Sequence, residues 1–268
     1  MRSLSCLLLT TTLLAGCALN PHHASGVHEQ KVSATLHGKT LELHLAAASD
    51  AAAQQPLVLY ASGDGGWFGA AVDMFDAIAH DGYNVVGFSA RTFLRLERPD
   101  GRLSNPEQLA SEYDTILAET RTALHLSSDT PIVLSGWSRG AAFAILVATA
   151  RNAPSHLRGV VSIGLTDGED LQVSEADDSD DAGVAGSSHR SRFQPYARIG
   201  RLGDIRCAVI QATGDHFLPA ARAHELFGAD TPFRHFYAVT ARNHRFSGGR
   251  TAFESALADA LHWAGSTQ

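Results

Sequence analysis

The sequence predicts an α/β protein in which a mostly parallel central sheet has helices on both faces. Short apolar runs of strand length alternate with helix-forming segments along most of the chain. These strands are apolar on both faces, which is typical of a parallel sheet covered on both sides. A length of 268 residues with 44% hydrophobic residues suits one domain with a full core.

The elements follow one another in a regular order. Alternating apolar residues over 32–46, around His37-Gly38, predict a hairpin. Buried strands are expected at residues 57–60, 85–88, 131–135, 160–163, 207–210 and 234–239. Helices are expected at 70–79, from Asn105 onward, and at 141–148, 220–227 and 251–263. Asn105 and Pro106 form a helix start, because Asn is a favoured N-cap and Pro suits the first helical position.

The first sixteen residues have the pattern of a secretory signal peptide. Arg2 precedes a short apolar region that is too short to span a bilayer, and Leu14-Ala15-Gly16-Cys17 follows. This ending resembles the bacterial lipobox, in which Cys17 is acylated and becomes the first residue. The alternative is an ordinary signal peptide cleaved near Ala15 or Ala18. We therefore expect a lipoprotein signal peptide at 1–16, a tether at 17–27 and a single domain at 28–268.

Charge and cysteine content limit the partners and the redox chemistry. The net charge of −7 argues against nucleic acid and against an anionic membrane surface, so membrane contact would depend on the lipid anchor. Of the three cysteines, Cys6 leaves with the signal peptide and Cys17 carries lipid. Only Cys207 then remains in the domain. It starts an apolar run and is expected to be a buried small hydrophobe.

The pentapeptide Gly136–Gly140 is the central functional motif. It places Ser138 in a G-x-S-x-G pattern between the strand at 131–135 and the helix at 141–148. Strand, sharp turn and helix are the context of a nucleophile elbow, which exposes the serine hydroxyl at the end of the strand. A glycine-rich turn with an idle serine is the alternative, so partners for the serine must be found elsewhere.

An acyl-transfer serine needs a base and an orienting acid, which follow it in the order Ser, Asp or Glu, His. Asp215 follows the strand at 207–210 in a Gly-Asp turn, where the acid belongs, although it could instead be a turn or N-cap residue. His244 lies in the loop after the next strand and is the candidate base. His216 is adjacent to the acid and His235 lies within a strand, so both are less suitable.

Glycines after the strand at 57–60 allow the backbone to approach a substrate oxygen closely. We assign the oxyanion donors to the backbone N–H groups of Asp64 and Arg139. Gly65, Trp67 and Trp137 are candidate substrate-binding residues, although the two tryptophans could equally be core residues. The glycine spacing does not match a phosphate-binding loop, and the fourteen histidines form no H-E-x-x-H motif, so neither a nucleotide nor a metal or other cofactor is expected.

Residues 166–198 include an acidic, Gly- and Ser-rich stretch that interrupts the regular pattern. It lies after the strand that follows the nucleophile helix, where an α/β-hydrolase inserts a cap. We interpret it as a short acidic cap insertion. It could be no more than a solvated segment, or it could attract a cationic group of the substrate.

From about residue 57 to the end, the chain resembles the bacterial VirJ/AcvB family of exported α/β-hydrolases. The resemblance depends on Ser62–Trp67, Val85-Val86-Gly87, the pentapeptide around Ser138 and Asn243-His244-Arg245-Phe246. The family usually has Tyr where Trp137 stands and a non-basic residue where Arg139 stands. Arg91 could match a family arginine, with a one-residue offset, and is a candidate phosphate contact.

This resemblance implies a periplasm-facing lipoprotein of the bacterial envelope that removes the aminoacyl group from aminoacyl-phosphatidylglycerol, such as the alanyl or lysyl form. The expected enzyme is a serine esterase that uses Ser138, Asp215 and His244. Two alternatives stay open. One is a general carboxylesterase or thioesterase of the envelope, and the other is a non-catalytic secretion-system accessory protein built on a hydrolase fold.

Overall fold

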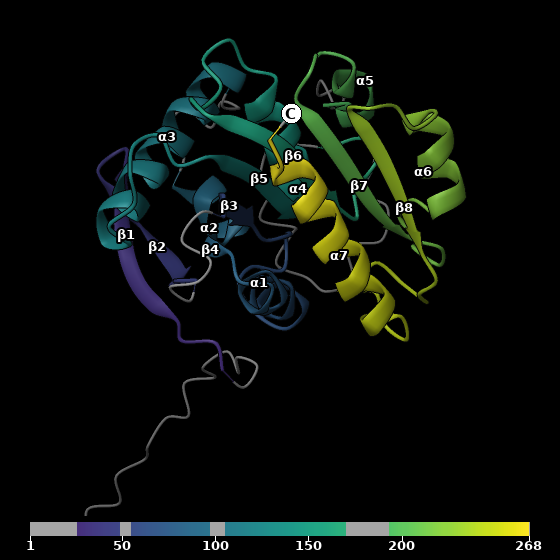
Figure 1. The fold of residues 1–268 in the computed structure, drawn as a ribbon, viewed down its shortest axis with the longest axis horizontal. Coiled ribbons are helices and arrows are strands. Elements are labelled where there is room, and N and C mark those ends of the chain that lie inside the picture. The colour runs from purple at the N-terminus through teal and green to yellow at the C-terminus, as the bar shows by residue number, and fades with distance from the viewer. Residues whose placement is uncertain (1–25, 49–54, 97–104, 170–192, 268) are drawn as a thin grey trace, which may run out of the picture.

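The computed structural model describes residues 26–48, 55–96, 105–169 and 193–267. Its centre is an eight-stranded sheet in the order β1-β2-β4-β3-β5-β6-β7-β8 (Figure 1). β1 pairs with β2 and β2 with β4 in antiparallel fashion, and all other neighbours are parallel. The strands are β1 Gln30–Leu36, β2 Lys39–Ala46, β3 Leu57–Ala61, β4 Asn84–Phe88, β5 Ile132–Trp137, β6 Leu157–Ile163, β7 Arg206–Ala212 and β8 Arg234–Val239.

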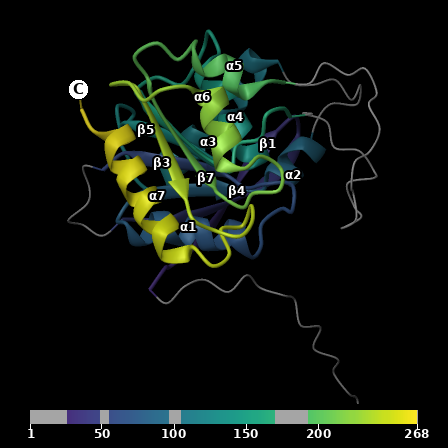
Figure 2. The ribbon, with the colours of Figure 1, turned by 90° about the vertical axis from the view of Figure 1, so that its right-hand side faces the viewer.

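Helices cover both faces of the sheet. They are α1 Ala70–His80, α2 Ala90–Arg95, α3 Pro106–Ala123, α4 Arg139–Ala148, α5 Pro195–Ile199, α6 Ala220–Phe227 and α7 Arg250–Gly265. The buried residues of α1 and α7 belong to one apolar cluster and those of α2 to α6 to the other. The edge-on view shows the two helical layers on opposite sides of the sheet (Figure 2).

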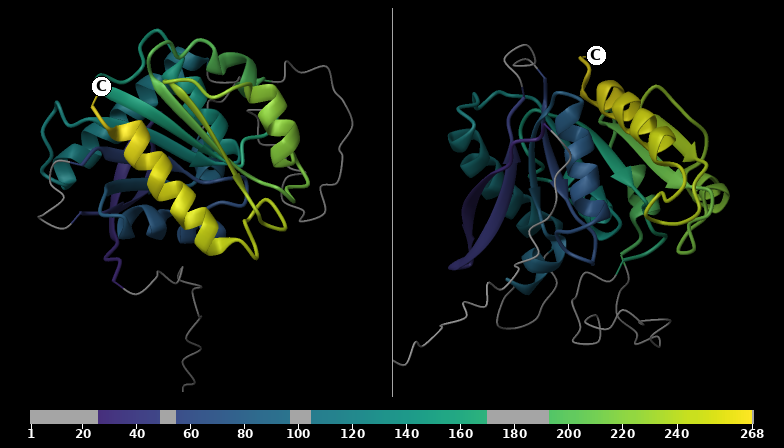
Figure 3. Two further views of the ribbon diagram at one scale, coloured as in Figure 1. Left: turned by 45° about the vertical axis from the view of Figure 1, so that its right-hand side comes forward. Right: turned by 90° about the horizontal axis from the view of Figure 1, so that it is seen from below.

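The hairpin and the last parallel strand lie at opposite edges of the sheet (Figure 3). The hairpin turns at His37 and Gly38, whose φ values of 51° and 74° suit a tight two-residue connection. From β3 onward the strands run parallel, so their carboxyl ends share one edge. The loops after β3, β5, β6, β7 and β8 therefore meet there, at the edge where open α/β sheets bind ligands.

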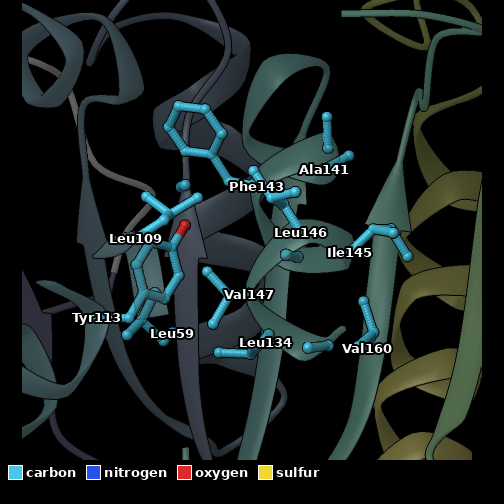
Figure 4. Packing of buried hydrophobic residues seen from close by; sticks show 14 of the residues in the cluster. Leu59, Leu109, Tyr113, Leu134, Ala141, Phe143, Ile145, Leu146, Val147 and Val160 are labelled. Atoms are coloured by element: carbon cyan, nitrogen blue, oxygen red, sulfur yellow. The ribbon is translucent and has the colours of Figure 1, made fainter. Parts of the chain in front are cut away.

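α4 is buried on all sides, which explains why its sequence is apolar without a polar stripe. Its Ile145 and Val147 pack in the same cluster as Leu134 of the sheet and Tyr113 of α3 (Figure 4). The turn at Ser138 thus leads into a helix whose residues are all buried.

The expected α/β-hydrolase fold, with its mostly parallel sheet and two helical layers, is confirmed. Two short helices were not predicted, α2 and α5, because a single turn or two gives too short a periodic pattern to recognise. The strand before Ser138 also continues to Trp137, and α4 begins at Arg139 rather than at residue 141.

The expected signal peptide at 1–16, Cys17, most of the tether and most of the acidic insertion lie outside the described residues. The described ends of the insertion, Glu169 and Phe193, form an antiparallel bridge. Among the residues that the structure describes, no helix has the length and apolar character needed to cross a membrane.

Candidate active site

Ser138 occupies a strained turn between β5 and α4. Its φ and ψ are 57° and −118°, values that a side-chain-bearing residue rarely adopts. A Cβ at Gly136 would lie 2.2 Å from the backbone of Gly140, and one at Gly140 would lie 2.0 Å from the carbonyl oxygen of Ala61. Both glycines are therefore required for the turn, as a nucleophile elbow demands.

The turn is fixed by backbone hydrogen bonds and leaves the serine reachable. The Ser138 N–H donates to the carbonyl oxygen of Ile163 at 2.8 Å, which ties the elbow to β6. Ser138 itself is only half-buried. Arg139 is the first residue of α4, so its backbone N–H has no acceptor within the helix and lies at the positive end of the helix dipole.

Asp215 is fully buried at the end of β7, and both of its carboxylate oxygens are hydrogen-bonded. Oδ1 accepts from the Phe217 N–H at 2.9 Å. Oδ2 accepts from Gln211 Nε2 at 2.9 Å and lies 2.6 Å from His244 Nδ1. Asp215 thus has both of the roles considered from the sequence: it caps a turn through Phe217 and it contacts the His244 imidazole. Three neighbours, the Phe217 N–H, Gln211 Nε2 and His244 Nδ1, therefore fix the orientation of the carboxylate.

The loop that carries His244 is built by its neighbours. Asn243 Oδ1 accepts from the N–H groups of Arg245 and Ser247, both at 3.1 Å. The acid and base loops also contact each other directly, because the Gly214 N–H donates to the Ala241 carbonyl at 2.9 Å. A Cβ at Gly214 would lie 2.7 Å from the Arg242 carbonyl oxygen, so only glycine allows this approach.

The His244 ring lies beside the elbow. Its centroid is 5.4 Å from that of Trp137, whose Nε1 donates to the His244 carbonyl at 3.2 Å. A Cβ on Gly164, the residue after Ile163, would lie 2.8 Å from His244 Cε1. Ser138 and His244 therefore flank the same stretch of backbone. Among the described residues, the buried Nε2 of His244 has no hydrogen-bond partner.

The glycine loop after β3 approaches the elbow closely. A Cβ at Gly63 would lie 3.2 Å from Ser138 Cβ and 3.3 Å from Trp137 Cε3. The Gly66 N–H donates to the Gly63 carbonyl at 3.2 Å, which closes a turn around Asp64. The predicted oxyanion residues, Asp64 and Arg139, come together, with 2.5 Å between Asp64 Oδ1 and Arg139 Nε.

The two predicted tryptophans have different environments. Trp67 stacks on His44, with 4.1 Å between ring centroids, and meets Phe75 at 5.2 Å, so it anchors the glycine loop to β2 and α1. A Cβ at Gly87 would lie 2.1 Å from the Trp67 ring, so β4 also fits around it. Trp67 is therefore chiefly a packing residue, whereas Trp137 contacts the candidate base.

Gly65, Trp67 and Arg91 line one cavity of about 270 Å³. The side chains around it are polar, and the full lining is Glu42, His44, Gly65, Gly66, Trp67, Ser89, Arg91 and Thr92. Arg91 lies in α2, one of the two helices that sequence patterns missed. Three of the four predicted substrate-binding residues thus meet in one cavity, and Trp137 lies outside its lining.

Two other contacts were not foreseen. Gln211 is a fully buried amide that donates to Asp215 and to the Leu218 carbonyl, the latter at 2.6 Å. The sequence signal for Gln211 was a polar residue within the apolar run of β7, Arg206–Ala212. Cys207 itself is buried, and burial raises the pKa of its thiol to about 12, so it is not poised as a nucleophile. The described residues contain no cluster of three metal-ligating side chains.

The sheet order and the two helical layers are those of the α/β-hydrolase fold. Solved structures of that class align with almost the whole chain. A dienelactone hydrolase from Klebsiella pneumoniae aligns with 90% of this chain and 99% of its own, at 12% identity and a TM-score of 0.62. An α/β serine hydrolase without lid from Xanthomonas campestris aligns over 93% and 100%, at 14% identity and a TM-score of 0.56. An esterase domain from Rhodothermus marinus aligns over 89% and 96%, at 15% identity and a TM-score of 0.56.

Within this class, residues 55–184 match the model of the family described as bacterial virulence protein (VirJ). The match confirms the resemblance to the VirJ family that the motifs indicated. It covers Asp64, Ser138 and Arg139 but ends before Asp215 and His244. No functionally curated protein matches the chain in sequence.

Proposed function

We propose that the protein is a serine esterase that cleaves the aminoacyl ester of aminoacyl-phosphatidylglycerol through an acyl-enzyme. The observation that carries the chemistry is the buried Asp215–His244 hydrogen bond of 2.6 Å, next to a serine in a nucleophile elbow. A carboxylate on Nδ1 holds the imidazole proton there and leaves Nε2 as the basic atom. That Nε2 has no hydrogen-bond partner among the described residues, so it is available to accept the hydroxyl proton of Ser138 when substrate is bound.

In the first step, His244 Nε2 takes the Ser138 hydroxyl proton while Oγ attacks the ester carbonyl. The developing oxyanion accepts from the backbone N–H groups of Asp64 and Arg139. Collapse of the intermediate breaks the ester bond, and His244 gives its proton to the glycerol oxygen of phosphatidylglycerol. Water then attacks the acyl-enzyme with His244 as base, which releases the amino acid and restores Ser138.

The choice of substrate rests on the VirJ resemblance and on the cavity beside the glycine loop. Arg91 there supplies a cation for the phosphodiester, next to Gly65 on the loop that reaches Ser138. Glu42 in the same cavity opposes an anion, so the phosphate assignment depends on Arg91. Replacing Arg91 with Gln should raise KM for the lipid and leave small neutral esters unaffected.

The place of action follows from the amino terminus. Acylation of Cys17 would hold the domain at a membrane of the bacterial envelope, facing the periplasm, where its lipid substrate lies. Each buried CH₂ of an attached chain contributes about 0.8 kcal/mol to that anchoring. Replacing Cys17 with Ser should release the protein from the membrane fraction without changing turnover of a water-soluble ester.

The main test compares turnover of alanyl- and lysyl-phosphatidylglycerol in vesicles by the wild type and two variants. Ser138→Ala and His244→Ala should each lower kcat by at least about 10³-fold, because triad members act as a unit. The matched controls are His216→Ala, next to Asp215, and His235→Ala on β8, which should keep normal turnover. Retained turnover in Ser138→Ala, or loss only in a control variant, would contradict the assignment.

Two alternative functions predict different experimental results. The esterase and dienelactone hydrolase structures among the relatives make a general envelope carboxylesterase or thioesterase the next candidate. It predicts faster turnover of p-nitrophenyl esters or acyl thioesters than of aminoacyl lipids. A non-catalytic accessory protein predicts a folded chain that a fluorophosphonate probe never labels at Ser138.

A further inference from the structure

A buried arginine side chain follows the nucleophile. The Arg139 side chain is only 9% exposed, and its Nε lies 2.5 Å from Asp64 Oδ1 and 3.5 Å from Glu169 Oε2. The Nε–H makes no aligned hydrogen bond, so these contacts are ion pairs. Arg139 is the first residue of α4, after β5, whereas Asp64 and Glu169 come from the loops after β3 and β6.

A cation is unfavourable at this position without partners. Arg139 begins α4, where the helix dipole is positive, and burial removes water from the guanidinium. Two nearby carboxylates offset both costs. Glu169 is itself held in place, since Thr166 Oγ1 donates to its Oε1 at 2.9 Å and its backbone bridges to Phe193 through two hydrogen bonds of 2.8 Å.

The ion pair joins the same two residues whose backbone N–H groups we assign to the oxyanion. Asp64 lies on the glycine loop and Arg139 on the helix, and these segments are not adjacent in sequence. Gly63 brings the loop backbone near Ser138, but it supplies no side chain to set the distance between the two donors. The side-chain contact of 2.5 Å joins the two segments directly.

We propose that the Arg139 guanidinium is a positioning group that holds the two oxyanion donors in register through its ion pair with Asp64, with Glu169 as the fixed anchor behind it. This inference rests on the proposed serine hydrolase function. It makes the side chains of Asp64 and Arg139 one functional unit, distinct from the Asp215–His244 pair.

The test is a double-mutant cycle with Asp64→Asn, Arg139→Gln and the double variant, measured as kcat and KM on one ester substrate. Each single variant should lower kcat by roughly tenfold to a hundredfold, part of the effect of losing an oxyanion donor, with KM little changed. The double variant should be no slower than the slower single variant. Arg139→Lys, which keeps the charge, should recover much of kcat.

The matched control is Asp73→Asn. Asp73 is 49% exposed and lies 2.8 Å from Arg250, so it resembles Asp64, which is 54% exposed, in burial and pairing. It lies on α1, and its replacement should leave kcat unchanged. The rate of labelling by a fluorophosphonate gives a second readout, because the phosphonyl oxygen uses the same donors, and it should fall in parallel with kcat.

The outcomes separate the two proposals. A wild type that neither turns over esters nor labels at Ser138 overturns the proposed function and this inference with it. An active wild type whose kcat is unchanged by Asp64→Asn, or multiplicative losses in the double variant, overturns the inference alone. If Arg139→Gln does not fold, Asp64→Asn decides the matter, since a half-exposed carboxylate can be replaced without loss of the core.

Discussion

The turn that carries Ser138 and the loops that surround it are held by different kinds of contact. At the turn, Gly136 and Gly140 face backbone atoms, and the Ser138 N–H bonds to the Ile163 carbonyl. Around it, side-chain pairs add to the backbone contacts of the loops: Asp215 to His244, Asp64 to Arg139, and Trp67 to His44. The serine is positioned by backbone contacts alone, whereas its partners are positioned by polar and aromatic pairs as well.

This difference separates stability from activity. A turn packed against backbone tolerates no added volume, so changes there should affect the fold first. A loop fixed by side-chain pairs can lose one pair and still fold, so changes there should affect chemistry first. The following variants test whether that division holds.

The largest effect is expected from Gly140→Ala. Its Cβ would lie 2.0 Å from the Ala61 carbonyl oxygen, and neither backbone segment can yield without disturbing the sheet. We expect a loss of unfolding free energy of about 4–5 kcal/mol, at the upper end for single substitutions, measured by thermal or urea unfolding. The control is Gly200→Ala, where the nearest atom is the flexible end of Arg234 at 3.7 Å. Equal stability of the two variants would contradict the steric explanation.

The next largest effect is expected from Asp215→Asn, and it should be a loss of activity rather than of stability. An amide in place of the carboxylate no longer holds the Nδ1 proton of His244, so the wrong tautomer is favoured and kcat should fall by about 10⁴-fold. The unfolding temperature should change far less than in Gly140→Ala. Circular dichroism and ester turnover on the same sample check both. An unfolded Asp215→Asn chain would show that this pair supports the fold as much as the turn does.

Gly164→Ala should produce a smaller loss of activity. The new Cβ would lie 2.8 Å from His244 Cε1 and push the ring away from Ser138, which we expect to lower kcat by about 10²-fold. The φ of +59° adds backbone strain of about 1–2 kcal/mol. Gly203→Ala shares that strain, with φ of +58°, but its Cβ meets nothing within 4 Å. A similar kcat in both variants would exclude displacement of the ring.

The smallest expected effect is a change in the pH dependence of stability. It involves His44, which stacks on Trp67 of the glycine loop. Burial lowers the pKa of His44 from its ordinary 6.5 and outweighs Glu29 and Glu42, which raise it, while Lys31 lowers it further. The unfolded chain therefore binds a proton at higher pH than the folded chain. The stability that neutral His44 contributes is present above about pH 6.5 and is lost as the pH falls below it.

The unfolding temperature should accordingly decrease between pH 7.5 and 5.5, and the decrease should be shallower in His44→Gln. His235→Gln, with a side chain 43% exposed, is the control and should keep the slope of the wild type. An unchanged slope in His44→Gln would place the pH sensitivity elsewhere.

The sequence was sufficient to predict most of the fold because the strands are apolar runs and the turn glycines have local roles. β8 and α6 begin and end where the apolar patterns placed them. The candidate residues Ser138, Asp215 and His244 could be named because each follows a strand, and parallel strands end at one edge.

Contacts between loops could not be predicted in the same way. Gln211 reaches Asp215 within one turn of chain, but Arg139 meets Asp64 and Glu169 only because β3, β5 and β6 are neighbours in the sheet. Trp67 was equally compatible with a pocket and with the core. The Trp67 ring packs against His44, which lies on the antiparallel hairpin far upstream in the sequence.

Each of the three tryptophans has a histidine ring nearby, and this gives the protein built-in spectroscopic reporters. Trp67 faces His44 at 4.1 Å, Trp137 faces His244 at 5.4 Å and Trp263 faces His235 at 5.7 Å. A protonated imidazole quenches indole emission, so the fluorescence of chains that retain one tryptophan would follow one histidine at a time. In the chain that retains Trp137, emission would record the charge of His244 without any substrate present.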